Sequence, residues 1–134
     1  MQQEIAGLSE LLTYFDNRGI HTCILYGYAN SSRYIQSSDI DLAVTAKKPL
    51  SDSDLVTYYI KAVDLLRREV DLSDLRTAKG VFLKEILTTG EILLNKNSEF
   101  LGIKAIKMID YQSDLAPSIN SMLKRRLKLA INGK

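Results

Sequence analysis

Two aspartates separated by one residue, Asp39 and Asp41, have the type and spacing that best suit chemistry in this chain. They stand in a run that alternates polar and apolar residues, which is typical of a strand, so both carboxylates are expected on one face. Ile40, Leu42 and Val44 then point to the other face and can pack into a core. Two like charges side by side are unfavourable unless a cation lies between them, so this pattern indicates a divalent metal site.

A third acid, Asp71, alternates with Val70 and Leu72 in another half-buried strand pattern. If that strand lies beside the strand over residues 39–45, all three carboxylates share one face of the sheet. Carboxylates with no histidine or cysteine nearby are hard oxygen ligands, which magnesium and manganese prefer. Gly27 ends an earlier apolar strand, and a glycine there lets backbone N–H groups approach anionic phosphates closely. Together these residues predict phosphoryl or nucleotidyl transfer assisted by two metal ions.

The elements that must position these residues follow from the periodicity of apolar side chains. We predict helices over residues 3–17, 51–68 and 79–89, and strands over residues 21–26, 39–45, 69–75 and 91–95. From Ser98 onward the pattern is helical and is broken near Pro117. This order predicts an α/β (α+β) chain, with a small mixed β-sheet flanked by helices and a helical C-terminal tail. We expect one domain over residues 1–134, with a core over about 1–97 and C-terminal helices over about 98–132.

The composition disfavours several other classes of protein. A chain of 134 residues with 46% hydrophobic and 25% charged residues is typical of a single globular domain, and its net charge of +2 does not indicate nucleic-acid or membrane binding. No apolar run approaches the roughly 20 residues of a membrane span, and Cys23 is the only cysteine, so we expect a cytoplasmic location. His21 is the only histidine, which argues against histidine-rich zinc sites. Neither a dinucleotide-binding fingerprint nor a P-loop is present.

The spacing of the glycine and the acids carries a resemblance to a known family. Gly27, Asp39 and Asp41 resemble the Gly-Ser-x10-Asp-x-Asp motif of the DNA polymerase β-like nucleotidyltransferase superfamily, and Asp71 resembles its third metal-binding aspartate. The short chain looks like the minimal nucleotidyltransferase (MNT) branch, and within it like the MntA-type antitoxins that pair with HEPN toxins. The resemblance therefore implies the polymerase β-like nucleotidyltransferase fold.

The resemblance also implies an activity. Asp39, Asp41 and Asp71 would be the catalytic and metal-binding residues, holding two magnesium ions (Mg2+), and Asp71 would help to deprotonate the acceptor hydroxyl. The donor would be ATP, and the acceptor a tyrosine of the cognate HEPN ribonuclease, which adenylylation inactivates. We therefore expect a HEPN-family toxin protein as the partner, with no membrane and no direct nucleic-acid binding.

The loop that begins at Gly27 departs from the family pattern. The resemblance implies nucleotide binding by Gly27, Tyr28 and Ser38, but Tyr28 stands where the family has a small serine. A phenol is bulkier and holds its hydroxyl further out, which predicts reduced nucleotide affinity or turnover. Two alternatives stay open: a catalytically weakened MNT-fold antitoxin that acts by binding alone, and a nucleotidyltransferase that modifies a small molecule.

The C-terminal segment over residues 116–134 contains five lysines and arginines and no acid. Its apolar residues fall on a helical stripe, so we expect a terminal helix that docks this stripe on the core and leaves its basic face in solvent. The alternative is that the basic face contacts an acidic partner or an RNA-bound toxin.

Overall fold

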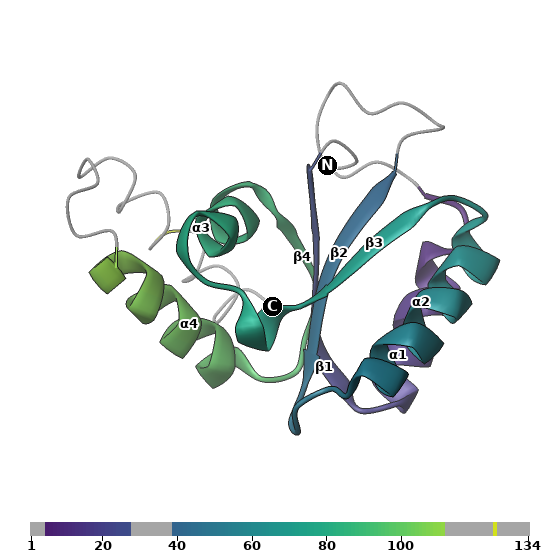
Figure 1. Ribbon diagram of the computed structural model, residues 1–134, viewed down its shortest axis with the longest axis horizontal. Helices are drawn as coiled ribbons and strands as arrows, with labels where there is room; N and C mark the ends of the chain where they lie inside the picture. The colour runs from purple at the N-terminus through teal and green to yellow at the C-terminus, as the bar shows by residue number, and fades with distance from the viewer. Residues whose placement is uncertain (1–4, 28–38, 112–124, 126–134) are drawn as a thin grey trace.

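The computed structural model describes residues 5–27, 39–111 and 125 (Figure 1). Along the chain, its elements are α1 (Leu8–Asn17), β1 (Ile20–Tyr26), β2 (Ile40–Ala46), α2 (Asp52–Leu66), β3 (Val70–Asp74), the 3-10 helix η2 (Leu75–Thr77), α3 (Gly80–Thr89), β4 (Glu91–Asn95) and α4 (Ser98–Tyr111).

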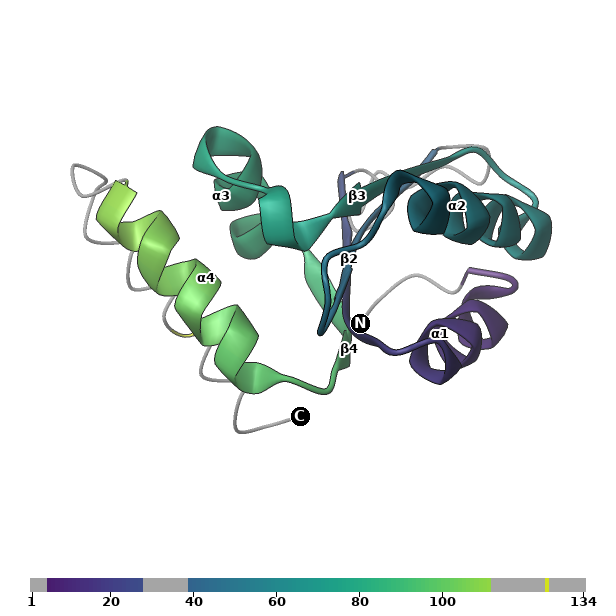
Figure 2. The ribbon, with the colours of Figure 1, turned by 60° about the horizontal axis from the view of Figure 1, so that its bottom comes forward.

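The described strands form one four-stranded sheet in the order β3-β2-β1-β4. β1 is antiparallel to both β2 and β4, whereas β2 and β3 are parallel and are joined through α2. Helices cover both faces of this sheet, with α1 and α2 on one side and α3 and α4 on the other (Figures 1 and 2). The predicted α/β class with a small mixed sheet is confirmed.

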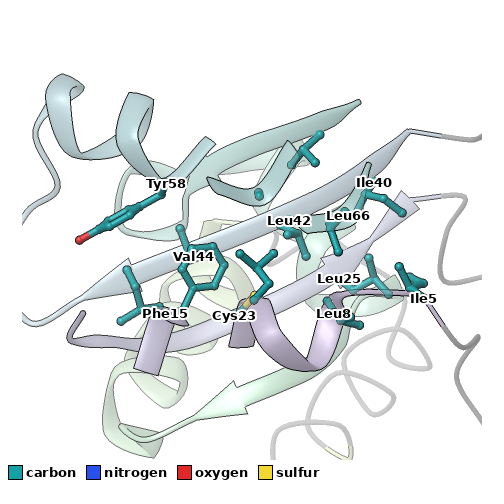
Figure 3. Close-up of a cluster of buried hydrophobic side chains, with 14 residues drawn as sticks. Ile5, Leu8, Phe15, Cys23, Leu25, Ile40, Leu42, Val44, Tyr58 and Leu66 are labelled. Atoms are coloured by element: carbon teal, nitrogen blue, oxygen red, sulfur yellow. The ribbon is translucent and has the colours of Figure 1, made fainter. Parts of the chain in front are cut away.

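The face of the sheet under α1 and α2 carries the larger apolar core (Figure 3). Leu42 and Val44 of β2 point into it, as their alternation with Asp41 predicts, and Phe15 of α1 is fully buried against them. Tyr58 of α2 also belongs to this core, and its ring packs edge-on against Phe15. Burying these side chains fixes which face of β2 is apolar and leaves the opposite face to Asp41.

The opposite face of the sheet packs against α3 and α4. Its strand residues are Ile24, Tyr26 and Ala43, and the helices contribute leucine, isoleucine, alanine and methionine side chains: Leu83, Ile86, Leu87, Leu101, Ala105 and Met108. This second core places α3 beside the ends of β1 and β2 that carry the predicted site residues.

Two basic side chains hold α4 to the rest of the molecule. The Lys104 ammonium donates to the carbonyls of Arg76 and Ala78 at 2.9 and 2.8 Å, and burial lowers its pKa. The Arg76 guanidinium donates to the carbonyls of Ala46 and Lys47 and lies over the ring of α4 residue Phe100. These charges are used in hydrogen bonds to backbone, so we assign them a structural role.

The predicted element boundaries are close to those observed, with two corrections that have local causes. The first helix begins at Leu8 and not near residue 3, because Gly7 adopts a left-handed conformation with φ of 84°. The second helix ends at Leu66, since Arg67 is itself left-handed with φ of 60°. Its predicted start is confirmed by a capping box, in which Ser51 and Asp54 each accept a hydrogen bond from the other's backbone.

Most of the predicted C-terminal tail, including the break near Pro117, lies outside the described residues. Beyond α4 the structure describes only Arg125, whose side chain is exposed. In the described part of the chain, no helix combines the length and the apolar character that a bilayer crossing requires.

Gly7 offers a test of how α1 packs on α2. A Cβ at this position would overlap the carbonyl oxygen of Leu65, and the φ of 84° is costly for any other residue. We expect Gly7→Ala to lower the free energy of unfolding by about 2–4 kcal/mol, measured by urea denaturation. Gly19→Ala is the matched control, because Gly19 has a similar φ of 89° but open space around it, and should cost only about 1 kcal/mol. Equal losses would show that α1 shifts freely to accommodate the methyl group.

Candidate active site

The predicted site lies where β1 ends and where β2 and β3 begin. These three strand ends meet at one end of the sheet, because β1 is antiparallel to β2 and β2 is parallel to β3 (Figure 1). Asp41 pairs in register with Tyr26 of β1 on one side and with Asp71 of β3 on the other. Directly paired residues on neighbouring strands point to the same face, so both carboxylates lie on the α3–α4 side of the sheet.

The absence of a side chain at Gly27 leaves space for the Asp41 carboxylate. It follows β1 with a φ of 77°, and a Cβ built on it would overlap Oδ2 of Asp41. A residue with a side chain would therefore meet both an unfavourable backbone conformation and the carboxylate itself. The sequence predicts a glycine that lets phosphates approach the backbone, and the structure adds a second reason for the same residue.

The third acid, Asp39, stands just before β2 and is exposed, as is Asp71, whereas Asp41 is partly buried between them. Burial, together with the charges of Asp71 and Asp39 and a smaller effect of Glu85, raises the pKa of the Asp41 carboxyl to about 6. Asp39 and Asp71 are therefore each close enough to Asp41 to repel its carboxylate. A perturbed acid among like charges is typical of a functional site.

The chemistry of these donors fits a hard divalent cation, because all of them are carboxylates and a cation would relieve their repulsion. As the side chains stand, however, no group of three or more aspartate, glutamate, histidine or cysteine residues within 5–27, 39–111 and 125 could hold a metal ion. The metal site at Asp39, Asp41 and Asp71 stays a prediction.

Two residues beside the acids were missed by the sequence reasoning. Tyr26 is 4% exposed and packs edge-on against Phe82 with 5.9 Å between ring centroids. The charges of Asp71 and Asp41 contribute to raising its pKa. Glu85 of α3 adds a fourth negative charge near the site. Pairing β1 with β2 around the intervening loop would have placed Tyr26 opposite Asp41, but no local pattern indicates Glu85.

Other predicted residues fall outside the site or outside the described chain. Tyr28 and Ser38, predicted to bind nucleotide, are not among the described residues. Asp74, whose position out of alternation with Asp71 predicts a turn or surface acid, is the last residue of β3 and is buried: its carboxylate accepts the backbone N–H of Arg76 at 2.8 Å at the start of η2. Cys23 is a free thiol in the core, and burial raises its pKa to about 12, so it is inert.

Comparison with known proteins identifies the family. Residues 9–99 match the family described as polymerase beta, nucleotidyltransferase. The chain belongs to this family. The predicted nucleotidyltransferase fold is thus confirmed, and the motif glycine and all three acids lie within the matched region.

Similar proteins include a protein adenylyltransferase. The protein adenylyltransferase MntA of Shewanella oneidensis is 30% identical over 89 residues, which cover 65% of this chain and 64% of that relative. The match thus spans a little less than two thirds of the relative's length. The predicted similarity to MntA is confirmed.

Solved structures share the fold of this family member. A toxin–antitoxin crystal structure with AMP-PNP has a TM-score of 0.69 and 23% identity, covering 87% of this chain and 95% of that one. A tri-AMPylated HEPN toxin of Shewanella oneidensis in complex with MNT antitoxin gives a TM-score of 0.64 and 23% identity, covering 89% and 94%. At this identity, the likeness is one of fold.

Proposed function

We propose that this chain is an antitoxin that neutralises a HEPN ribonuclease toxin by magnesium-dependent transfer of AMP from ATP to a toxin tyrosine. The observation that carries the proposal is the placement of Asp41 in register with Asp71 and against Gly27, in a chain of the nucleotidyltransferase family. The similarity to the adenylyltransferase MntA, and to the fold of antitoxins solved with a toxin or with AMP-PNP, supports the choice of donor and partner.

Asp39, Asp41 and Asp71 would hold the metal in this proposal. When bound, magnesium would supply the positive charge that offsets repulsion between these carboxylates and the triphosphate. Gly27, Tyr28 and Ser38 would contact the nucleotide. The role of Asp41 is to bind and orient from a partly buried position, because its carboxylate is confined between the other acids and the surface of Gly27.

Asp71 is suited to act on the acceptor, since its side chain is exposed and reachable by a group on another protein. The tyrosine oxygen would form a bond to the α-phosphorus as the bond from that phosphorus to the bridging oxygen of the β-phosphate breaks. Pyrophosphate leaves, and an Asp71 carboxylate oxygen takes the phenolic proton.

An acceptor carried by a partner fits a chain whose described elements are used to build the sheet and its covering helices. A cytoplasmic setting is part of the proposal, consistent with Cys23 being a free thiol.

A second candidate function is neutralisation of the toxin by binding alone. It is favoured by Tyr28, which replaces the motif serine with a bulkier side chain. This alternative keeps the fold and the partner but needs neither ATP nor the acids.

Label transfer separates the two candidates. The full-length chain is incubated with α-labelled ATP, magnesium and the HEPN toxin, and the toxin is examined for label and for ribonuclease activity. We expect label on the toxin, none with Asp41→Asn, and normal labelling with Asp64→Asn, since Asp64 is an exposed acid on α2, under the other face of the sheet. Neutralisation without label, unchanged in Asp41→Asn, would contradict the catalytic proposal and support binding alone.

The loop residue Tyr28 gives a separate prediction. A serine there would restore the small hydroxyl of the family motif, so we expect Tyr28→Ser to lower the KM for ATP or to raise kcat. Steady-state labelling of the toxin at increasing ATP concentrations measures both. Unchanged or lower activity would mean that the loop is built around the tyrosine.

A further inference from the structure

Tyr26 is a core residue whose hydroxyl has no hydrogen-bond partner among the described residues. Its ring belongs to the core under α3 and α4, and the side chain is 4% exposed. The buried hydroxyl has no partner in hydrogen-bonding geometry among the residues that the structure describes. The Ser73 hydroxyl is close enough to lower the pKa of Tyr26 as a hydrogen-bond partner would, but its geometry falls short of a hydrogen bond. Burying an unpartnered hydroxyl is unfavourable, whereas phenylalanine would fill the same space at no such cost.

The phenol reaches from β1 across β2 towards β3. Tyr26 pairs in register with Asp41, and Ala43, the next residue of β2 on that face, pairs with Ser73. Because the Ser73 side chain lies beside the phenol, the ring must pass over the small methyl group of Ala43. The hydroxyl therefore lies near the strand that carries Asp71.

In the part of the chain that the structure describes, the charged groups that act on this hydroxyl are all carboxylates. Burial raises the pKa of Tyr26, the approach of the Ser73 hydroxyl as a hydrogen-bond partner lowers it, and the charges of Asp71, Asp41 and Glu85 raise it further, with a net increase. The phenol is therefore protonated at neutral pH and available as a donor. Phe82 packs against the ring, and this contact, together with the sheet beneath, limits how far the hydroxyl can move.

We propose that Tyr26 is a positioning residue for Asp71: in the assembled site its hydroxyl donates a hydrogen bond to the Asp71 carboxylate and fixes its orientation. This inference rests on the proposed function, in which Asp71 binds metal and receives the acceptor proton. A hydrogen bond to a ligating carboxylate holds it in one orientation, and loss of such a partner typically costs about 10- to 100-fold in metal affinity or activity. In this proposal the hydroxyl donates its hydrogen bond to Asp71 only when the metal-bound site is assembled.

Tyr26→Phe tests the inference, because it removes the hydroxyl and keeps the ring. We expect kcat for toxin labelling to fall about tenfold with the KM for ATP unchanged. The magnesium concentration that gives half of the maximal rise in melting temperature, measured without nucleotide or toxin, should rise about tenfold. The melting temperature without magnesium should not fall, because the hydroxyl forms no hydrogen bond with the described residues.

Tyr58→Phe is the matched control, a buried tyrosine in the core on the other face of the sheet, and should leave both kcat and the magnesium midpoint unchanged (Figure 3). An unchanged kcat and magnesium midpoint in Tyr26→Phe would overturn the inference. So would a fall in the metal-free melting temperature that accounts for the lost activity, since the hydroxyl would then serve the fold, for example through Ser73. A wild-type chain that magnesium stabilises but that labels no toxin would contradict the proposed function, and the magnesium midpoint would still decide the role of Tyr26.

Discussion

Asp41→Asn is expected to stabilise the folded chain while it lowers the proposed AMP transfer by about a hundredfold or more. Asp41 is partly buried beside Asp71, Asp39 and Glu85, and this environment raises its pKa to about 6. The folded state therefore disfavours the charged carboxylate, and an uncharged amide of the same size removes the repulsion. Asp41, which a metal-dependent transfer would need most, therefore lowers the stability of the folded state.

The sign of the pH dependence follows from the raised pKa. In the unfolded chain Asp41 has an ordinary carboxyl pKa, so between about pH 4 and pH 6 the folded state binds more protons and the stability falls as pH rises. Above pH 6 the penalty is complete. A tenfold change in proton affinity corresponds to about 1.4 kcal/mol, so a rise of the pKa from 3.8 to about 6 would correspond to about 3 kcal/mol without screening. Solvent screening at this partly exposed site reduces the net penalty to about 1 kcal/mol.

We therefore expect Asp41→Asn to raise the melting temperature at pH 7.5 by about 3–6 °C, with the gain shrinking towards pH 4. Magnesium should raise the melting temperature of the wild type and have much less effect on the variant. Transfer to the toxin should fall by about a hundredfold or more, because the amide carries no charge for the metal. Asp64→Asn, on the exposed side of α2, is the control for a general change in net charge. A variant less stable than the wild type at pH 7.5 would show that the Asp41 carboxylate makes favourable contacts that outweigh the repulsion.

The features of the site that depend on local periodicity were predictable from the sequence. Alternation along residues 39–45 assigned Leu42 and Val44 to the core and Asp41 to the other face, because burial of one face fixes the register of a strand. That the strand of Asp71 lies beside the strand of Asp41 was only a condition of the prediction. The structure meets it with two parallel strands connected through a helix, which is the usual route to parallel neighbours. The glycine and acid spacing then identified the family.

The surroundings of the acids were not predictable, because packing of distant segments decides them. Glu85 approaches Asp41 only because α3 packs on that face of the sheet, and nothing near either residue encodes the contact. Asp74 was predicted to be a turn or surface acid, and its burial depends on a backbone N–H of Arg76 that satisfies its carboxylate. The start of α1 was also missed, because Gly7 is set in a left-handed conformation at the point where Leu65 of α2 passes.

Gly27→Ala is expected to lower the proposed AMP transfer by about a hundredfold with little loss of stability. The added methyl group would occupy the position of Oδ2 of Asp41, and a short side chain such as aspartate can avoid it only by turning its carboxylate away. A displacement of about 1 Å in a reacting group can cost about a hundredfold in rate. The φ of 77° adds a backbone penalty of about 1 kcal/mol, which a domain of this size tolerates.

Gly19→Ala separates the two effects, because Gly19 has a similar φ of 89° and nothing within 4 Å of an added Cβ. Both variants should lose about the same stability in urea denaturation, and only Gly27→Ala should lose transfer. The kinetic constants then distinguish two reasons for the glycine. If the methyl group keeps the triphosphate from the backbone, the KM for ATP rises; if it turns the Asp41 carboxylate away, kcat falls. Because the overlap in this structure is with the carboxylate itself, we expect the loss in kcat, and a change confined to KM would assign Gly27 to phosphate binding alone.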